Sequence, residues 1–216
     1  MQIKKGEIQS ANAFIKGHFD RLIEWQIGDI KKCCRMREDG TCEDDGALVG
    51  AFTLWVCAID YFGGLYTGLA TQGGTESRFR EFIKKYMPKY DWEKVVELRW
   101  SLTHFYSPHF FALYHENNLE QNKNLHLQLT NRGIRLHLGW AIKDLEDGVN
   151  KFYEELKNDN NMKVVVLRYY KEHLPIMPVR AEDLFPQPTF NSLPSTVAIQ
   201  SVPASGTVSL EEILKK

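Results

Sequence analysis

Apolar residues recur every three or four positions along most of the first 173 residues, the spacing of one face of an α-helix. The pattern predicts a long first helix that ends near Cys34. It also predicts a helix over residues 47–61 that is apolar almost all round and therefore central in the core. Two further helices are expected over residues 140–156 and 162–170, with a strand as the alternative at the valine run 164–166. The chain is thus predicted to be mainly α, a helical bundle.

Two further helices are predicted from residues that cap helix N-termini. Thr75 is expected to cap a helix over residues 76–86, and Asp91 one that runs to about His104. Glycines before Thr75 are interpreted as breaks and turns, because glycine is a poor helix former. They are Gly63, Gly64, Gly68, Gly73 and Gly74.

After the fourth predicted helix along the chain, the period of the pattern changes from about 3.6 to two. Leucines alternate with polar residues on both sides of Arg132-Gly133. This alternation predicts a β-hairpin insertion over about residues 124–139. A register that pairs Leu129 with Leu136 would keep the leucines on one face, which makes it the expected one.

The last part of the chain has a different composition. Six of the eight prolines lie there, among Ser and Thr residues that bury too little apolar surface to fold alone. We therefore expect a helical-bundle domain over 1–173 and an extended or disordered Pro-rich C-terminal tail over 174–216. Ser209 and Glu212 form a capping-box pattern for a short terminal helix. That helix would dock on a protein partner; a frayed end is the alternative.

Charge and composition narrow the class of protein. The 216 residues include 27 Lys and Arg and 28 Asp and Glu, so affinity for nucleic acid would need a local basic patch. No apolar run approaches the roughly 18 residues of a membrane span, and the N-terminus lacks the apolar core of a signal peptide. We expect a cytoplasmic protein without a membrane partner. Its cysteines, expected to be reduced thiols, are Cys33, Cys34, Cys42 and Cys57.

The candidate chemistry lies at Arg99 and His104. An arginine inside an apolar helical face must find a partner, reach solvent or face a cavity, since its charge cannot be shed. Histidine is the side chain best suited to proton transfer near neutral pH. Positions five apart on a regular helix point about 140° away from each other. The two side chains would meet only if the helix loosened before Pro108 or a second chain contributed.

An arginine and a histidine separated by four residues, on the last turns of a late helix, resemble the motif of the HEPN superfamily of ribonucleases and their inactive relatives. The resemblance covers residues 8–173 in helical outline and is specific only at 99–104. It implies a homodimer that cuts RNA without metal or cofactor. His104 would act as general acid or base on the ribose 2′-hydroxyl, and Arg99 would hold the phosphate. Trp100 departs from the family pattern, in which a polar residue usually follows the arginine.

A basic stretch with interleaved aromatic residues lies before this motif. Basic side chains outnumber acidic ones from residue 78 to 99, an arrangement suited to phosphates and stacked bases. A solvated helix face is the alternative. The candidate RNA-binding residues are Arg78, Arg80, Lys84, Lys85, Lys89, Trp100 and Tyr106.

Two functions of different classes remain open. The first is a metal-independent ribonuclease, a toxin or defence effector. The second is a non-catalytic module for RNA, a nucleotide or a protein partner, in which Arg99 pairs with a buried carboxylate and His104 is satisfied in the core. We expect no metal site, because the spacing of His104, His109, His115 and Glu116 matches no known ligand set.

Overall fold

The computed structural model describes residues 4–43, 46–69, 71–115 and 119–173, with only the backbone at 71–73. The chain divides into two units, residues 1–175 and 176–216. The predicted tail and its terminal helix lie outside the described residues. Within them the protein is mainly α-helical, as the periodicity predicts, with a small three-stranded sheet.

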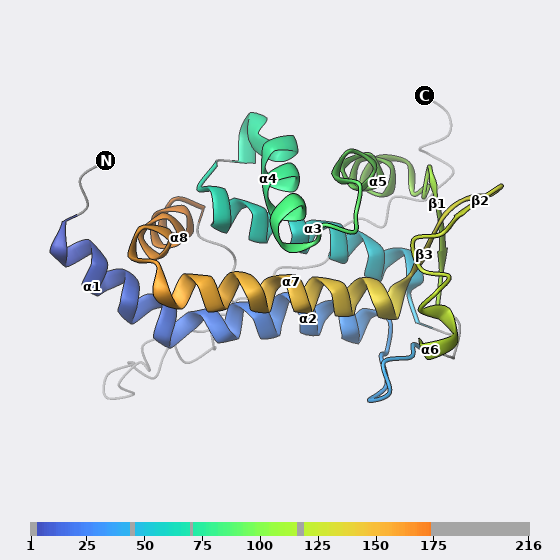
Figure 1. The fold of residues 1–216 in the computed structure, drawn as a ribbon, viewed down its shortest axis with the longest axis horizontal. Helices are drawn as coiled ribbons and strands as arrows, with labels where there is room; N and C mark the ends of the chain where they lie inside the picture. The colour runs from blue at the N-terminus through green and yellow to red at the C-terminus, as the bar shows by residue number, and fades with distance from the viewer. Residues whose placement is uncertain (1–3, 44–45, 70, 116–118, 174–216) are drawn as a thin grey trace, which may run out of the picture. The chain divides into compact units, whose positions relative to one another are not determined.

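The predicted long first helix is confirmed. It consists of α1 (Lys5–Phe14), a π-helical turn η1 (Ile15–Phe19) and α2 (Asp20–Cys33), which follow one another without a break. Figure 1 shows α2 beside α7 (Leu138–Asn158), and the two helices are in contact. The helix ends at Cys33, next to the predicted end near Cys34.

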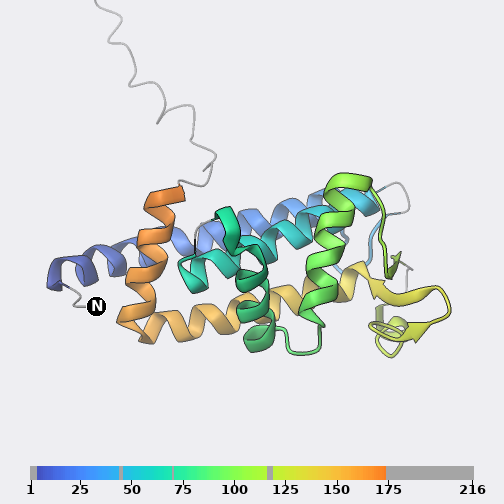
Figure 2. The same cartoon turned by 90° about the horizontal axis from the view of Figure 1, so that it is seen from above.

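α3 (Leu48–Thr67) is the central helix that the sequence predicts, but it is longer. It contacts α2, α4 (Thr71–Tyr86), α5 (Trp92–Phe105), α7 and α8 (Asn160–His173), so its apolar circumference is covered on most sides. Figure 2 shows α4, α5 and α8 crossing the long helices α2, α3 and α7. Each crossing helix covers a different part of α3.

The interpretation of the glycines as turns is wrong for all but Gly68, which ends α3 in the left-handed conformation at φ 68°. Gly63 and Gly64 lie inside α3, because their missing side chains make room for neighbours. A Cβ on Gly63 would lie 2.7 Å from the Arg78 carbonyl oxygen in α4. Helix α4 begins at residue 71, so Thr75 is not its cap. Close helix packing therefore overrides the low helix propensity of glycine.

Gly63→Ala is expected to lower the free energy of unfolding by about 1–3 kcal/mol, because the added methyl group overpacks the contact with α4. Gly28→Ala in α2 is the matched control, since nothing lies within 4 Å of its new Cβ. That variant is expected to gain up to about 1 kcal/mol from helix propensity. Urea unfolding followed by circular dichroism measures both, and stabilisation by both changes would contradict the close approach.

α5, α7 and α8 confirm the other predicted helices, with bounds shifted by a few residues. Asp91 caps α5 as expected: its Oδ1 accepts the N–H groups of Glu93 (3.1 Å) and Lys94 (3.4 Å). Tyr106, at φ 55°, ends α5 in the left-handed conformation. Both ends of α5 are thus set by local backbone chemistry.

The sheet combines a hairpin with a strand that was not predicted. β2 (Leu129–Thr130) and β3 (Gly133–His137) form the hairpin, and β1 (Phe111–Tyr114) pairs with β3 in parallel. The strand order is β1-β3-β2. A short helix, α6 (Leu119–Asn122), precedes the hairpin. β1 was missed because four residues are too few to show a period.

The predicted hairpin register is wrong. Leu129 pairs with Ile134, not with Leu136, and its side chain is 77% exposed. Gly133, at φ 111°, is the reason: a Cβ there would lie 2.3 Å from the Phe110 carbonyl oxygen. The chain ahead of β1 thus approaches the hairpin too closely for any other residue, and this contact sets the turn.

Among the described helices, α3 alone is long and apolar enough to span a membrane by length and composition. This finding corrects the expectation that no apolar stretch reaches such a length. Of its most apolar 18-residue window, 61% is buried inside the protein, and the core helix of a bundle meets the same criterion.

Candidate functional site

The two predicted catalytic residues lie on the last two turns of α5. Buried Val95, Leu98 and Leu102 fix the rotation of this helix against the core. Arg99 lies at the edge of the buried face, and His104 lies on the exposed face. The packing of α5 therefore directs the two side chains to different environments.

Arg99 belongs to an ion-pair centre formed by three helices, which we define as Asp60 of α3, Arg78 of α4 and Arg99 of α5. The Nε of Arg78 donates to Oδ1 of Asp60 at 2.6 Å, and the Nη2 of Arg99 lies 3.2 Å from Oδ2. The Arg78 side chain is 1% exposed, and its Nη2 also donates to Thr75 at 3.2 Å. Asp60 thus ties α4 and α5 to the central helix.

The Arg99 side chain is not fully buried in this arrangement. Its side chain is 23% exposed, and its Nε is buried without a hydrogen-bond partner in the described part of the chain. The guanidinium also lies over the Trp100 ring, 5.6 Å from the ring centre. The Asp60 carboxylate is the partner of two guanidinium groups, so Arg99 is paired without being fully enclosed.

His104 does not meet Arg99. Its ring stacks on Trp100, with 5.1 Å between ring centres and 18° between planes. The side chain is exposed, and no ion pair or hydrogen bond joins its imidazole to a residue that the structure describes. The expected divergence of the two side chains on a regular helix is therefore observed, and the imidazole is open to solvent.

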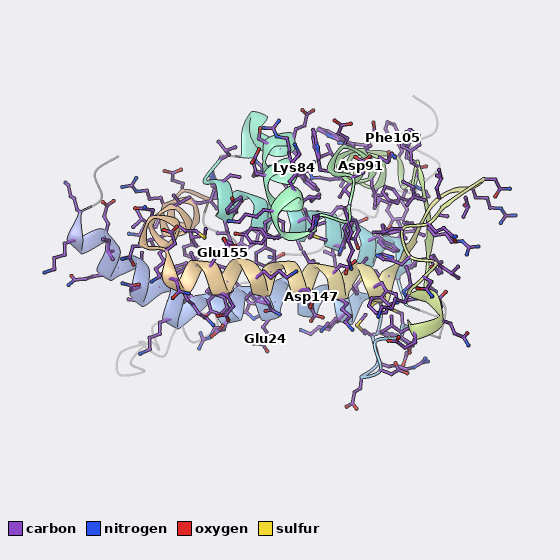
Figure 3. All side chains as sticks on the ribbon, in the orientation of Figure 1. Glu24, Lys84, Asp91, Phe105, Asp147 and Glu155 are labelled. Carbon is purple, nitrogen blue, oxygen red and sulfur yellow. The ribbon has the colours of Figure 1, made fainter. Side chains whose placement is uncertain are left out.

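Exposed rings lie next to His104 and on the chain that follows α5. Trp100, Phe105, Tyr106 and Phe110 are 48%, 77%, 73% and 47% exposed. Phe105 lies at the outer side of α5, away from α7, in Figure 3. We call these residues the aromatic surface, together with two histidines: Trp100, His104, Phe105, Tyr106, His109 and Phe110.

The loop that carries part of this surface is held in an uncommon conformation. Tyr106 and His109 have φ angles of 55° and 48°, a region that side chains with a Cβ seldom adopt. Such strain costs on the order of 1–3 kcal/mol for each residue and often accompanies function. The chain places bulky rings where glycine would fit better.

The predicted basic patch is largely neutralised by partners. Arg78 is buried in the ion-pair centre, so its predicted contact with RNA is corrected to a structural role. Lys85 lies 2.5 Å from Glu155, Lys89 lies 2.9 Å from Asp144, and Arg80 lies 3.0 Å from Glu81. Lys84, labelled in Figure 3, is exposed on α4. Of the predicted RNA-binding residues, Trp100 and Tyr106 lie on the aromatic surface.

A second polar cluster lies in the core, where sequence reasoning places no site. Asp144 of α7 accepts hydrogen bonds from Tyr90 (3.0 Å) and Lys89 (2.9 Å), and its Oδ2 lies 3.3 Å from Nε2 of His126. The Nδ1 of His126 accepts the His137 N–H at 3.2 Å. We call Tyr90, His126 and Asp144 the buried polar cluster; Lys89, whose side chain is 67% exposed, contacts it from the solvent side.

The cluster corrects a prediction from strand alternation. With the leucines on one face of the hairpin, the alternation predicts that His126 and His137 lie on the outer face, exposed to solvent. The His126 side chain is only 6% exposed and His137 is 1% exposed. The segment before the hairpin folds inward to reach Asp144, an interaction that strand alternation cannot reveal.

Sequence reasoning also missed Asp60. The one signal was a carboxylate inside the apolar run that forms α3, a position that requires a cationic partner. Among the described residues, no group of three or more His, Cys, Asp or Glu side chains could hold a metal ion. Glu116 of the discarded histidine set lies outside the described residues.

No family model, curated protein or solved structure matches this chain. The candidate site therefore rests on its own geometry.

Proposed function

We propose that two copies of this protein associate through the aromatic surface and that the cleft between them binds RNA and cleaves it without metal, as HEPN ribonucleases do. One observation carries the proposal. The imidazole of His104, which has no polar partner in the described chain, lies beside exposed rings, and the 23%-exposed side chain of Arg99 contacts one of them, Trp100.

The aromatic surface supports association with a protein surface. Contiguous exposed apolar rings are uncommon on monomers, and Trp, Tyr and Phe are enriched at the centres of interfaces. Residues Phe105 and Tyr106 are each more than 70% exposed side by side. A two-fold dimer would bring the same patch of each copy together. Burial in such an interface would also offset the strain at Tyr106.

A second copy would supply what one chain lacks. Arg99 is held toward Asp60 and His104 points away from it, so a single chain has no arrangement in which both contact one phosphodiester. In a two-fold dimer, each phosphate could lie between His104 residues of both copies. We therefore infer a cleft shared by two copies, because Arg99 and His104 of one copy point apart on α5.

The chemistry requires only proton transfer and charge stabilisation. One His104 takes the proton of the ribose 2′-hydroxyl, whose oxygen attacks phosphorus. The other gives a proton to the departing 5′-oxygen. The Arg99 side chain is 23% exposed, and its solvent-accessible N–H groups can donate to the phosphate oxygens as their charge increases. The products would be a 2′,3′-cyclic phosphate and a 5′-hydroxyl.

The alternative is a dimer that binds RNA without cutting it. The ion pair between Arg99 and Asp60 favours this alternative, because it holds the guanidinium on the side of α5 that faces α3. The pairing of Lys85 and Lys89 with carboxylates also lowers the attraction for a long RNA backbone.

The deciding experiment measures cleavage of a labelled structured RNA and of a tRNA pool in EDTA, beside the mass of the protein by light scattering. His104→Ala is expected to lower the cleavage rate at least about 100-fold, the usual size of a general acid or base contribution. Phe105→Ser is expected to yield monomers and lose activity together. Matched controls are His18→Ala, another exposed histidine, and Leu129→Ser, an apolar side chain with the same 77% exposure.

The possible outcomes distinguish the ribonuclease, the non-catalytic alternative and the dimer itself. Cleavage that survives His104→Ala would reject the ribonuclease. A wild-type dimer that binds RNA and leaves it intact would establish the non-catalytic alternative. A wild-type monomer at micromolar concentration, or a dimer unaffected by Phe105→Ser, would reject association through the aromatic surface.

A further inference from the structure

Two of the four cysteines lie together at the end of α2, far along the chain from the aromatic surface. Cys34 is the C-cap residue of α2, and Cys42 follows the loop of residues 35–41. Their exposed fractions are 1% and 2%. A hydrogen bond joins the two thiols, and the Cys34 thiol also lies 3.4 Å from the Lys31 carbonyl oxygen, to which it donates. The sequence offers no metal-type spacing for them, and only the fold brings them into contact.

Backbone hydrogen bonds also position this pair. The N–H of Met36 donates to the Lys31 carbonyl at 2.8 Å, which ends α2 and turns the chain. Met36 and Cys42 then form an antiparallel bridge. The loop between them is closed by a hydrogen bond from the Arg37 N–H to the Thr41 carbonyl at 2.8 Å. Both thiols are therefore positioned by hydrogen bonds that oxidation would leave in place.

The two sulfurs differ in their readiness to ionise. The hydrogen bond with Cys42 lowers the pKa of the Cys34 thiol and outweighs the opposite effect of burial. The same interaction, together with burial, raises the pKa of Cys42. Since the thiolate is the reactive form, Cys34 is the nucleophile and Cys42 the resolving thiol.

We propose that Cys34 and Cys42 are a redox modification site at which a hydroperoxide forms a reversible intramolecular disulfide. The Cys34 thiolate attacks one peroxide oxygen, the O–O bond breaks, and a sulfenic acid and hydroxide form. The Cys42 sulfur then attacks the Cys34 sulfur, the S–S bond forms, and the hydroxyl group leaves as water with the Cys42 proton. Two thiols lose two electrons and two protons, and hydrogen peroxide becomes two molecules of water.

Such a bond would fasten the 35–41 loop to the end of α2. It would cross-link positions that the native backbone already brings together, so the fold needs little adjustment. Closing a short loop restricts the unfolded chain and stabilises the native state. Oxidised protein is therefore expected to unfold at a temperature several degrees higher, about 5 °C by the usual scaling.

The test uses the full chain treated with hydrogen peroxide, then denatured, labelled with N-ethylmaleimide and weighed by mass spectrometry. The reduced protein has four thiols and takes four labels. The oxidised protein is expected to take two labels, to lose 2 Da before labelling as any disulfide does, and to recover after dithiothreitol. Cys34→Ser should keep all three remaining thiols. Cys42→Ala should form no disulfide and lose at most one label, that of Cys34, whose sulfenic acid has no resolving thiol. Cys57→Ser and Cys33→Ser are the controls and should still lose two labels.

Three results would overturn the proposal. One is a wild type that keeps four labels in peroxide. Another is a loss of two labels that persists in Cys42→Ala, since the bond would then join other thiols. The third is loss that disappears in Cys33→Ser, which would assign the reaction to Cys33. Circular dichroism of each variant confirms its fold before labelling.

Discussion

Asp60→Ala is expected to lower the free energy of unfolding by about 3–5 kcal/mol, because it leaves buried guanidinium charge without its carboxylate. Arg78 is the main reason. Its side chain is 1% exposed, and its Nε donates to Asp60 at 2.6 Å. Water cannot replace the carboxylate at such a position. The loss would also release α4 and α5 from α3, since Asp60 contacts both arginines.

Urea unfolding followed by tryptophan fluorescence measures this effect. Asp147→Ala is the matched control: Asp147 is an exposed carboxylate on α7, and its removal is expected to change stability by less than about 0.5 kcal/mol. Adding Arg99→Leu to Asp60→Ala should recover part of the loss, because it removes one of the two guanidinium charges that lose the Asp60 carboxylate. A cost below about 1 kcal/mol for Asp60→Ala would contradict a buried ion-pair centre.

Asp144→Ala is expected to cost about 2–4 kcal/mol at neutral pH, because it leaves the polar groups of Tyr90 and His126 buried without their acceptor. The effect should depend on pH. Burial alone would raise the pKa of Asp144, but hydrogen bonds from His126, Lys89 and Tyr90 hold that pKa below its usual value.

The sign follows from the lowered pKa. A carboxyl whose pKa is lower in the folded state stabilises the fold above the pKa of the unfolded group, about 3.9. This contribution is lost as pH falls through the lower folded value. The difference in unfolding free energy between wild type and Asp144→Ala should therefore be largest near pH 7 and shrink below about pH 4. Urea titrations at pH 7 and pH 3 measure it.

Two results would count against this account of the buried polar cluster. One is a difference that grows as the pH falls, which would require a raised pKa. The other is a Tyr90→Phe variant as unstable as Asp144→Ala. That variant removes only the hydroxyl, so Lys89 and His126 keep their contacts with Asp144 and the cost should be smaller.

Residue patterns predict only part of the candidate site. Arg99 and His104 are identified by residue type and spacing, and helix geometry correctly predicts that they point apart. The same pattern allows Arg99 either to line a catalytic cleft or to pair with a buried carboxylate. Only the contact with Asp60, 39 residues earlier in the chain, shows that a carboxylate is its partner. Nor does a pattern show that Phe105 and Phe110 stay exposed.

In the basic stretch, the number of charged residues in the sequence does not give the charge of the folded surface. Lys85 and Lys89 add to a local positive charge when the chain is read in order. In the fold, Glu155 and Asp144 of α7 lie beside them. Charge at a surface depends on which distant segments pack together, and a sequence window contains only one side of each pair.

The sequence by itself determined the helices and most of their ends. Periodicity is a property of a single segment, and the caps at Asp91 and Gly68 act on the nearest backbone groups. The tertiary structure decided what depends on contact between segments: glycines inside α3, the register of the hairpin and the partners of Arg99. Helix α4 lies so close to Gly63, and the chain ahead of β1 so close to Gly133, that backbone conformations allowed by local preference are excluded. This steric exclusion acts between residues far apart in the chain.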